Sequence, residues 1–117
     1  MEEQLLVELT AEGEWARVAI RGWVNMDTSE YLADQLKTFV EREGAKKFLI
    51  DVRDLEYVSS SGVGVFVDLF DQHKDEGGKI AFVGLRPAVR RVLDLVGFMS
   101  FFGDFETESD AITFLRA

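Results

Sequence analysis

Three adjacent serines are the residues of this chain whose types and spacing could do chemistry. Ser59, Ser60 and Ser61 follow a run of apolar and acidic residues and precede Gly62-Val63-Gly64. Serine hydroxyls in such a segment can act as nucleophiles, or cap a helix by accepting hydrogen bonds from its first amides. Serines at such positions more often cap a helix than take part in a reaction. The segment therefore predicts a helix start and leaves its chemistry open.

A catalytic role for these serines would require a nearby base. The single histidine, His73, lies thirteen residues after Ser60 on the same expected helix. At about 1.5 Å per residue the two side chains are roughly 20 Å apart, whereas a serine–histidine hydrogen bond needs about 3 Å. We expect His73 instead to meet free carbonyls at the end of that helix. The sequence has no cysteine, which excludes a thiol nucleophile. The sequence therefore gives no support for a hydrolase triad.

Phosphate and metal sites are the next alternatives. The serine segment lacks the lysine of a P-loop and the third glycine of a dinucleotide fingerprint, so nucleotide binding rests only on a bare helix start. Four acids, Asp104, Glu106, Glu108 and Asp110, have the composition of a metal cluster. A solvated group of acids near a helix start explains them better. We expect no metal and no cofactor.

Composition and charge limit the classes of partner. The 117 residues suit one domain over residues 1–117. With 13 basic and 22 acidic residues, the net charge of −9 disfavours nucleic acid and anionic lipid as partners. No stretch approaches the roughly 18 apolar residues that span a bilayer. Residues 1–4 begin with acids rather than with the basic and apolar order of a signal peptide, so we expect no membrane insertion and a cytoplasmic location.

The hydrophobic pattern predicts an α/β fold. Period-two and two-faced apolar runs indicate strands at residues 5–9, 15–21, 47–52, 79–83 and 101–102. Helical periods and their terminal signals indicate helices at residues 27–43, 61–76, 87–96 and 109–115, the first with a capping box at residues 27–30. Two initial strands followed by alternating helices and strands predict a mixed, mostly parallel sheet with about four helices and right-handed crossovers.

Residues 57–65, YVSSSGVGV, preceded by residues 50–55, closely resemble the signature of STAS domains, and in particular of bacterial anti-sigma-factor antagonists. The resemblance continues in order through residues 77–80, 86–93 and 96–98, and through Glu108, Ala111 and Leu115 of the last helix. It covers nearly the whole chain. It therefore implies a single STAS-like domain.

The resemblance also implies a function, which is a non-enzymatic protein–protein switch in bacterial signal transduction and transcription regulation. In this family the unphosphorylated antagonist binds an anti-sigma factor, often a serine kinase. That kinase phosphorylates a serine at the start of this helix, and a serine phosphatase reverses the reaction. Alignment on Gly62 assigns the phosphorylated position to Ser60. The chain has Ser59 and Asn25 at two positions where the family pattern has aspartate.

The implied partner surface spans residues 58–69 and the loop at residues 25–28. Its expected residues are Asn25, Asp27, Thr28, Ser59, Ser60, Ser61, Gly62, Val65 and Leu69. Two other functions stay open, a STAS subunit that docks on a membrane transporter complex and a small-ligand or nucleotide-binding STAS domain.

Two further groups of side chains have both a structural and a binding interpretation. Arg86, Arg90 and Arg91 share one helix, where a solvated face is favoured over a partner contact and Arg90 can pair with Asp94. Four apolar residues near the C-terminus are expected in the core, although their density also fits a homodimer contact. They are Phe98, Met99, Phe101 and Phe102.

Overall fold

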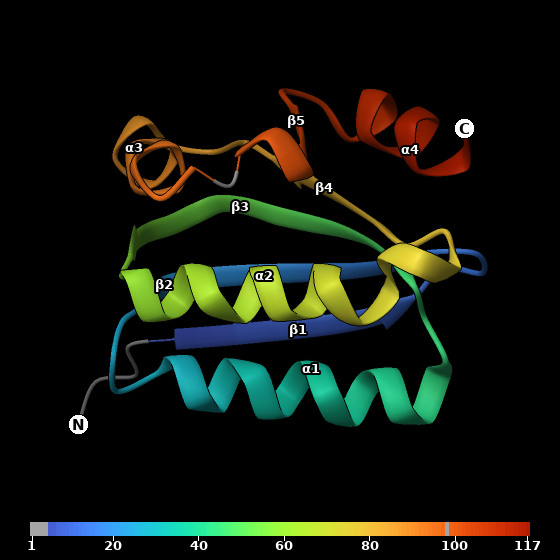
Figure 1. Ribbon diagram of the computed structural model, residues 1–117, viewed down its shortest axis with the longest axis horizontal. Coiled ribbons are helices and arrows are strands. Elements are labelled where there is room, and N and C mark those ends of the chain that lie inside the picture. Colours follow the sequence, from blue (N-terminus) through green and yellow to red (C-terminus); the bar gives the residue numbers. More distant parts are fainter. Residues whose placement is uncertain (1–4, 98) are drawn as a thin grey trace.

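The computed structural model describes residues 5–97 and 99–117, and its elements follow the expected order (Figure 1). The strands are β1 (Leu5–Ala11), β2 (Ala16–Val24), β3 (Lys47–Val58), β4 (Lys79–Val83) and β5 (Gly103–Phe105). The helices are α1 (Ser29–Glu43), α2 (Ser60–His73), α3 (Pro87–Leu95) and α4 (Glu108–Arg116), with short 3-10 helices at Lys74–Glu76 and Met99–Phe101. The predicted fold class is confirmed. The expectation for Phe98 falls outside the described residues.

The strands form one sheet in which the spatial order equals the chain order, β1-β2-β3-β4-β5. Strand β1 pairs antiparallel with β2, and each later pair is parallel with a helix in its connection. The C-terminal ends of β2 and β3 therefore lie at the same edge of the sheet. This edge carries both segments in which the sequence predicts a partner surface, residues 25–28 and the start of α2.

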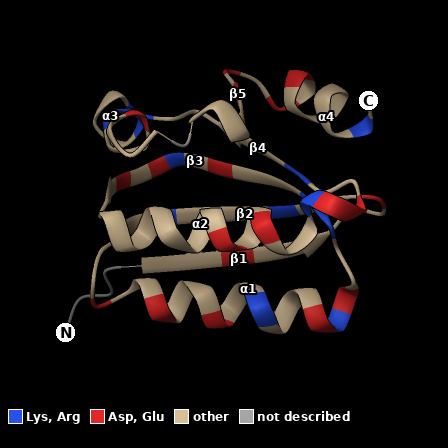
Figure 2. Cartoon of the chain, in the orientation of Figure 1, with Lys and Arg blue, Asp and Glu red and all other residues tan. Residues whose placement is uncertain are grey.

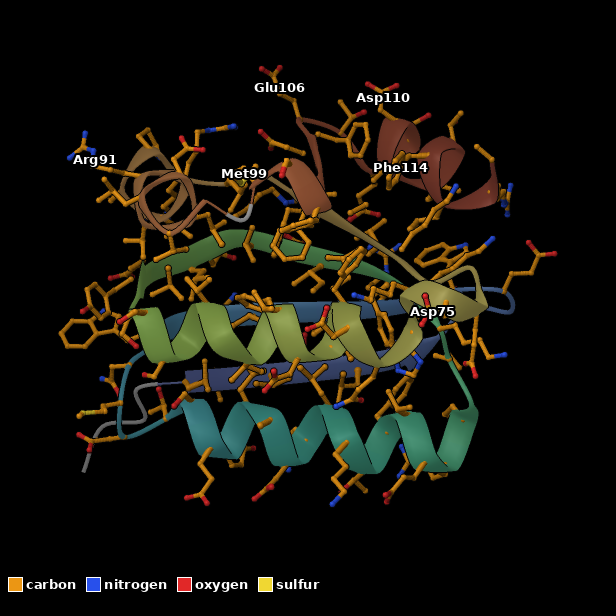
Figure 3. The ribbon with its side chains drawn as sticks, viewed as in Figure 1. Asp75, Arg91, Met99, Glu106, Asp110 and Phe114 are labelled. Carbon is orange, nitrogen blue, oxygen red and sulfur yellow. The ribbon has the colours of Figure 1, made fainter. Side chains whose placement is uncertain are left out.

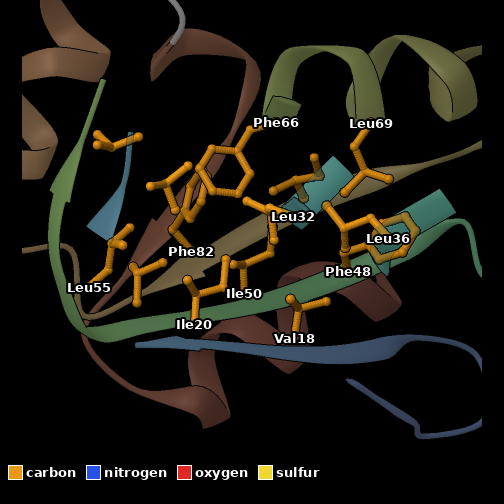
Figure 4. Close-up of a cluster of buried hydrophobic side chains, with 14 of the residues drawn as sticks. Val18, Ile20, Leu32, Leu36, Phe48, Ile50, Leu55, Phe66, Leu69 and Phe82 are labelled. Atoms are coloured by element: carbon orange, nitrogen blue, oxygen red, sulfur yellow. The ribbon is translucent and has the colours of Figure 1, made fainter. Parts of the chain in front are cut away.

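The sheet packs a different cluster of apolar side chains on each face. Helices α1 and α2 lie side by side across one face (Figure 1), and the main core fills the space between them and the sheet (Figure 4). Side chains of β3 alternate between faces, so Phe48 and Ile50 belong to this core while Leu49 belongs to the second cluster. The second cluster lies beneath α4 and consists of Trp15, Leu49, Ala81, Val83, Ala111 and Leu115.

Two predicted local features are wrong. The capping box at residues 27–30 does not form, because α1 begins at Ser29 and its N-cap, Thr28, makes no side-chain cap hydrogen bond. The Thr28 hydroxyl instead donates to the carbonyl of Trp23. The strand expected at residues 101–102 lies at Gly103–Phe105, because Phe102 turns inward and packs edge-on against Phe82.

Strand β3 is longer than the sequence predicts, since it ends at Val58 rather than at residue 52. The added part stays paired with β2, but the register shifts between Ala19 and Arg21 and again between Gly22 and Trp23. Gly22 has a φ of 107°, in the left-handed region that favours glycine. Such irregularities rotate the side chains that follow them. Trp23 and Tyr57, which pair across the two strands after the second shift, are both exposed.

Candidate functional site

The start of α2 is held by Ser59, which is the N-cap residue with an extended backbone. Its Oγ accepts a hydrogen bond from the Gly62 amide at 3.2 Å and lies 2.7 Å from the Oγ of Ser61. Its own amide donates to the carbonyl of Val24, at 2.8 Å. Ser59 therefore satisfies the first turn of α2 and connects it to the end of β2. The capping role predicted for the serine segment is confirmed for Ser59.

Ser60 differs from its two neighbours. It is the first residue of α2 and is exposed. The hydroxyls of Ser59 and Ser61 contact each other, whereas no described residue forms a hydrogen bond with the hydroxyl of Ser60. An incoming donor or phosphoryl group could reach this hydroxyl without displacing a protein contact. The N-terminal end of α2 also favours negative charge at this position.

Gly62 allows α2 to approach the sheet closely. A Cβ at this position would lie 2.6 Å from Cγ1 of Val24 and 2.7 Å from Cγ2 of Val58, and both valines are buried. Two residues later, a Cβ at Gly64 would have no atom within 4 Å. The close backbone approach predicted at Gly62 is confirmed, and it is specific to the first of the two glycines.

The loop at residues 25–28 is organised by Asn25. Its Oδ1 accepts hydrogen bonds from the backbone amides of Asp27 and Thr28, at 2.9 and 3.0 Å, while its backbone amide donates to the Thr28 hydroxyl. These bonds form an Asx turn, which asparagine makes as readily as aspartate. Asn25 therefore has a structural role in this chain, which is to hold the turn at residues 25–28. The loop leaves the Asp27 side chain exposed beside the start of α2.

The remaining members of the predicted partner surface are less accessible. Val65 is half-buried and packs against the main core. Leu69 is 4% exposed and lies within that core (Figure 4). Its predicted contact with a partner is therefore wrong, because the helical period places it on the face of α2 that meets the sheet. Gly62 is also buried and contributes backbone packing.

The role predicted for His73 is wrong as well. The side chain is buried, and neither ring nitrogen has a hydrogen-bond partner. It packs against Phe48, with 5.8 Å between ring centroids, rather than meeting carbonyls at the helix end. Burial lowers the pKa of His73 below its usual value, so the neutral imidazole is favoured.

The arginines of α3 have separate surroundings. Arg86 donates to the carbonyl of Arg53, and Arg90 pairs with Asp104 rather than with the expected Asp94. Arg91 is exposed and points outward (Figure 3). These residues do not converge on one site.

One of the acids near α4, Glu108, is held by cations from the sheet. Glu108 pairs with Arg17 at 2.6 Å and with Arg53 at 3.1 Å, and Arg53 also contacts Asp51 at 2.6 Å. The Arg53 guanidinium donates hydrogen bonds that hold the pKa of Asp51 below its usual value. Within the described ranges, no three acids or histidines gather in a way that could hold a metal ion. Glu108 therefore fastens α4 to the sheet.

An exposed aromatic pair beside the serine segment is a feature that the sequence interpretation missed. Trp23 and Tyr57 are each 48% exposed and pack edge to face, with 6.5 Å between ring centroids. Met26, in the adjoining loop, is 76% exposed. The sequence did carry one signal of this pair, because Trp23 and Tyr57 each lie two residues before a segment of the predicted partner surface, residues 25–28 and 59–61. The expected strand ended before Tyr57, so no face could be assigned to it.

The surface around Ser60 has a neutral centre and an acidic border. Residues 58–67 contain no charged side chain. Residues 22–36 and 54–73 contain no lysine or arginine, and their acids are Asp27, Glu30, Asp34, Asp54, Glu56, Asp68 and Asp71. Figure 2 shows this absence of basic residues along the first half of α1 and along α2. No helix among the described residues is long and apolar enough to cross a membrane.

Comparison with known protein families matches residues 8–111 to the STAS domain. The chain belongs to the STAS domain family. A relative of this STAS protein, the anti-sigma F factor antagonist of Paenibacillus polymyxa, is 26% identical over 99 residues, which is 85% of each chain. Members of this antagonist group are non-enzymatic. The chain is thus an anti-sigma-factor-antagonist-like STAS protein.

Solved structures share the STAS fold described above. The crystal structure of an anti-sigma factor antagonist from Mycobacterium paratuberculosis superposes with a TM-score of 0.84 and 23% identity, covering 97% of this chain and 95% of that one. The Bacillus cell fate determinant SpoIIAA in its phosphorylated form gives a TM-score of 0.72 at 20% identity, covering 95% of this chain and 100% of that one. At these identities the STAS protein shares their fold.

Proposed function

We propose that this STAS protein binds an anti-sigma factor and that phosphorylation of Ser60 reverses the binding. The binding surface comprises the exposed part of residues 59–65 and the loop at residues 25–28. One observation carries the assignment of Ser60, because it is the exposed serine at the start of α2 whose hydroxyl no described residue engages. The relatives named as antagonists supply the class of partner.

The position of Ser60 explains how a phosphate could act on binding without acting on the fold. A phosphoryl group adds about −1.5 to −2 charges and three acceptor oxygens. At the N-terminal end of α2, the helix dipole favours such charge by about 0.3–1 kcal/mol at an exposed site. The protein therefore stays folded. The contact surface changes instead, because residues 58–67 are neutral before modification.

A partner that packs on this neutral centre must desolvate any charge placed there. A charged group that is desolvated and left unpaired at an interface costs about 2–5 kcal/mol, which is some tens- to thousands-fold in affinity. This loss is larger than the favourable effect of the dipole. The phosphorylated form is therefore expected to release the anti-sigma factor.

The test uses Ser60→Asp and Ser60→Ala, with Ser109→Asp as the matched control. Ser109 is an exposed serine in the first turn of α4, which lies on the opposite face of the sheet from α2 (Figure 1), so it reports the effect of an acid at a helix start alone. Affinity for each purified anti-sigma factor of the source organism is measured by calorimetry, and melting temperature by circular dichroism. We expect Ser60→Ala and Ser109→Asp to bind as the unmodified protein does and Ser60→Asp to bind at least tenfold more weakly.

Phosphorylation itself is checked by incubation with ATP and the anti-sigma factor that binds, if it is a serine kinase, followed by peptide mass spectrometry. Phosphate on Ser59 or Ser61 instead of Ser60 contradicts the assignment. If no anti-sigma factor binds and the protein co-purifies with a transporter ATPase, the proposed partner class is wrong.

A further inference from the structure

The exposed aromatic pair has surroundings that suit one kind of side chain from another molecule. Trp23, Asn25, Glu56 and Tyr57 line an open, mostly apolar hollow at the ends of β2 and β3. The Trp23 Nε1 lies 3.4 Å from Oε1 of Glu56, so a carboxylate borders the rings. Trp23 follows the regular alternation of β2, and the extra residues of β3 bring Tyr57 opposite it, so that both rings reach solvent.

Three aromatic rings elsewhere in the chain have a cation from within the protein over them. Arg17 lies over Trp15, Arg42 over Phe39 and Lys79 over Phe114, at 5.4, 5.7 and 5.0 Å from the ring centroids. No described lysine or arginine lies over Trp23 or Tyr57, although both rings are half exposed. Glu56 likewise forms no ion pair with any described residue.

The charges of the residues around the hollow also favour the binding of a cation. Residues 22–30 and 54–65, at this end of the molecule, contain four acids, Asp27, Glu30, Asp54 and Glu56, and no basic residue, and Asp54 is paired with Arg21 and Arg86. A cationic group that arrives from outside thus meets two aromatic faces, one carboxylate and an acidic border. Nothing within these segments competes for those contacts.

We propose that this hollow binds an arginine side chain presented by the partner protein. A guanidinium is planar, stacks on aromatic faces and can donate two parallel hydrogen bonds to a carboxylate such as Glu56. A lysine ammonium is a more strongly hydrated point charge and matches this set less well. The inference deepens the proposed function, since it rests on that function for the partner class and names the chemistry that the partner must carry.

The hollow is continuous with the surface around Ser60. The Ser59 amide bonds to the carbonyl of Val24, the residue after Trp23, and the Thr28 hydroxyl bonds to the carbonyl of Trp23. The two parts of this contact surface differ in the charge of the group that each would bind. The neutral centre packs against the partner and responds to phosphate, while the aromatic hollow receives an arginine at the border of the same contact.

The test does not need the anti-sigma factor. A phage-displayed library of random 12-residue peptides is selected on the immobilised protein, and each enriched peptide is synthesised with arginine, lysine or citrulline at its shared basic position. Citrulline keeps the planar shape of arginine without its charge. Dissociation constants are measured for the unmodified protein and for Trp23→Ala, Tyr57→Ala and Glu56→Gln. Glu14→Gln, an exposed acid at the opposite end of β2, is the matched control.

We expect the enriched peptides to share an arginine and to lose at least tenfold in affinity with citrulline and with Trp23→Ala or Tyr57→Ala. Glu56→Gln is expected to weaken them several-fold and Glu14→Gln not at all. Circular dichroism of each variant separates lost binding from lost folding. The inference is overturned if no peptide is enriched, if the enriched peptides lack arginine, or if they bind Trp23→Ala equally well. It is also overturned if sedimentation shows a dimer that Trp23→Ala abolishes, since a second copy would then cover the rings.

These outcomes are separable from the proposed function. If an anti-sigma factor binds the unmodified protein and Trp23→Ala with equal affinity, the arginine inference fails and the proposed function stands. If arginine peptides bind at the hollow but no anti-sigma factor does, the proposed partner class fails and the inference about the hollow stands.

Discussion

The close approach of α2 to the sheet predicts opposite effects for the same substitution at two neighbouring glycines. At Gly62 an added Cβ would meet methyl groups of Val24 and Val58 at 2.6 and 2.7 Å, where carbon atoms ordinarily lie about 3.5–4 Å apart. Both valines are buried, and β-branched side chains have few rotamers into which to retreat. Overpacking of this kind costs about 1–3 kcal/mol.

The helical setting partly offsets this cost. Glycine within a helix is about 0.5–1 kcal/mol less favourable than alanine. Gly62→Ala is therefore expected to lower the free energy of unfolding by about 1–2 kcal/mol. Gly64→Ala adds its methyl group to open space, so it gains the propensity alone and is expected to stabilise by about 0.5–1 kcal/mol.

Urea unfolding followed by circular dichroism measures the difference. Both variants should retain the m-value of the unmodified protein, so that the shift in midpoint reports stability alone. We expect the two midpoints to move in opposite directions, and Gly62→Val to destabilise more than Gly62→Ala. Equal stability of Gly62→Ala and Gly64→Ala would refute the reasoning, because steric contact would then not distinguish the two positions.

Further substitutions test three other contacts. Because burial lowers the pKa of His73, the unfolded chain binds a proton that the folded one resists, so stability should fall as pH decreases below about 6.5; His73→Phe should remove this dependence in thermal melts. Because Arg53 lowers the pKa of Asp51, the contribution of this carboxylate is present above about pH 4 and is lost below it. Asp51→Asn should therefore cost about 1 kcal/mol or less at pH 7, and an equal deficit at pH 2.5 would contradict the assignment. Ser59→Ala should cost about 1 kcal/mol through the lost N-cap, whereas Ser60→Ala should leave the urea midpoint unchanged.

The order of the elements could be predicted from the sequence because terminal signals and apolar periods agree along most of the chain. Gly44 closes α1 in the left-handed conformation, and Pro87 begins α3, as their types suggest. The end of β3 could not be predicted in this way. Arg53, Asp54 and Glu56 give residues 53–56 the composition of a loop, yet pairing with β2 continues through two register shifts. Pairing of this kind depends on the partner strand and is invisible in a local pattern.

The candidate site was predictable to a similar degree. The serine segment and Asn25 lie together because parallel strands place their C-terminal ends at one edge, a rule that follows from the predicted topology. The difference between the three hydroxyls was not predictable, since it depends on the contact between Ser59 and Ser61. The exposure of Tyr57 was not predictable, because extra residues in β3 decide which side its ring faces, whereas Trp23 continues the alternation of β2.

The order of strands in the sheet has a consequence for how the chain assembles during synthesis. Each strand pairs with the one that precedes it in the chain, so a strand leaving the ribosome finds its neighbour already made. The cluster under α4 is the exception, since it joins Trp15 to Ala111 and Leu115. Leu49, Ala81 and Val83 must therefore wait for the last helix before they are covered. A nascent chain that lacks α4 thus exposes an apolar sheet face to other chains, and the folding of α4 onto the sheet is the step that ends this exposure.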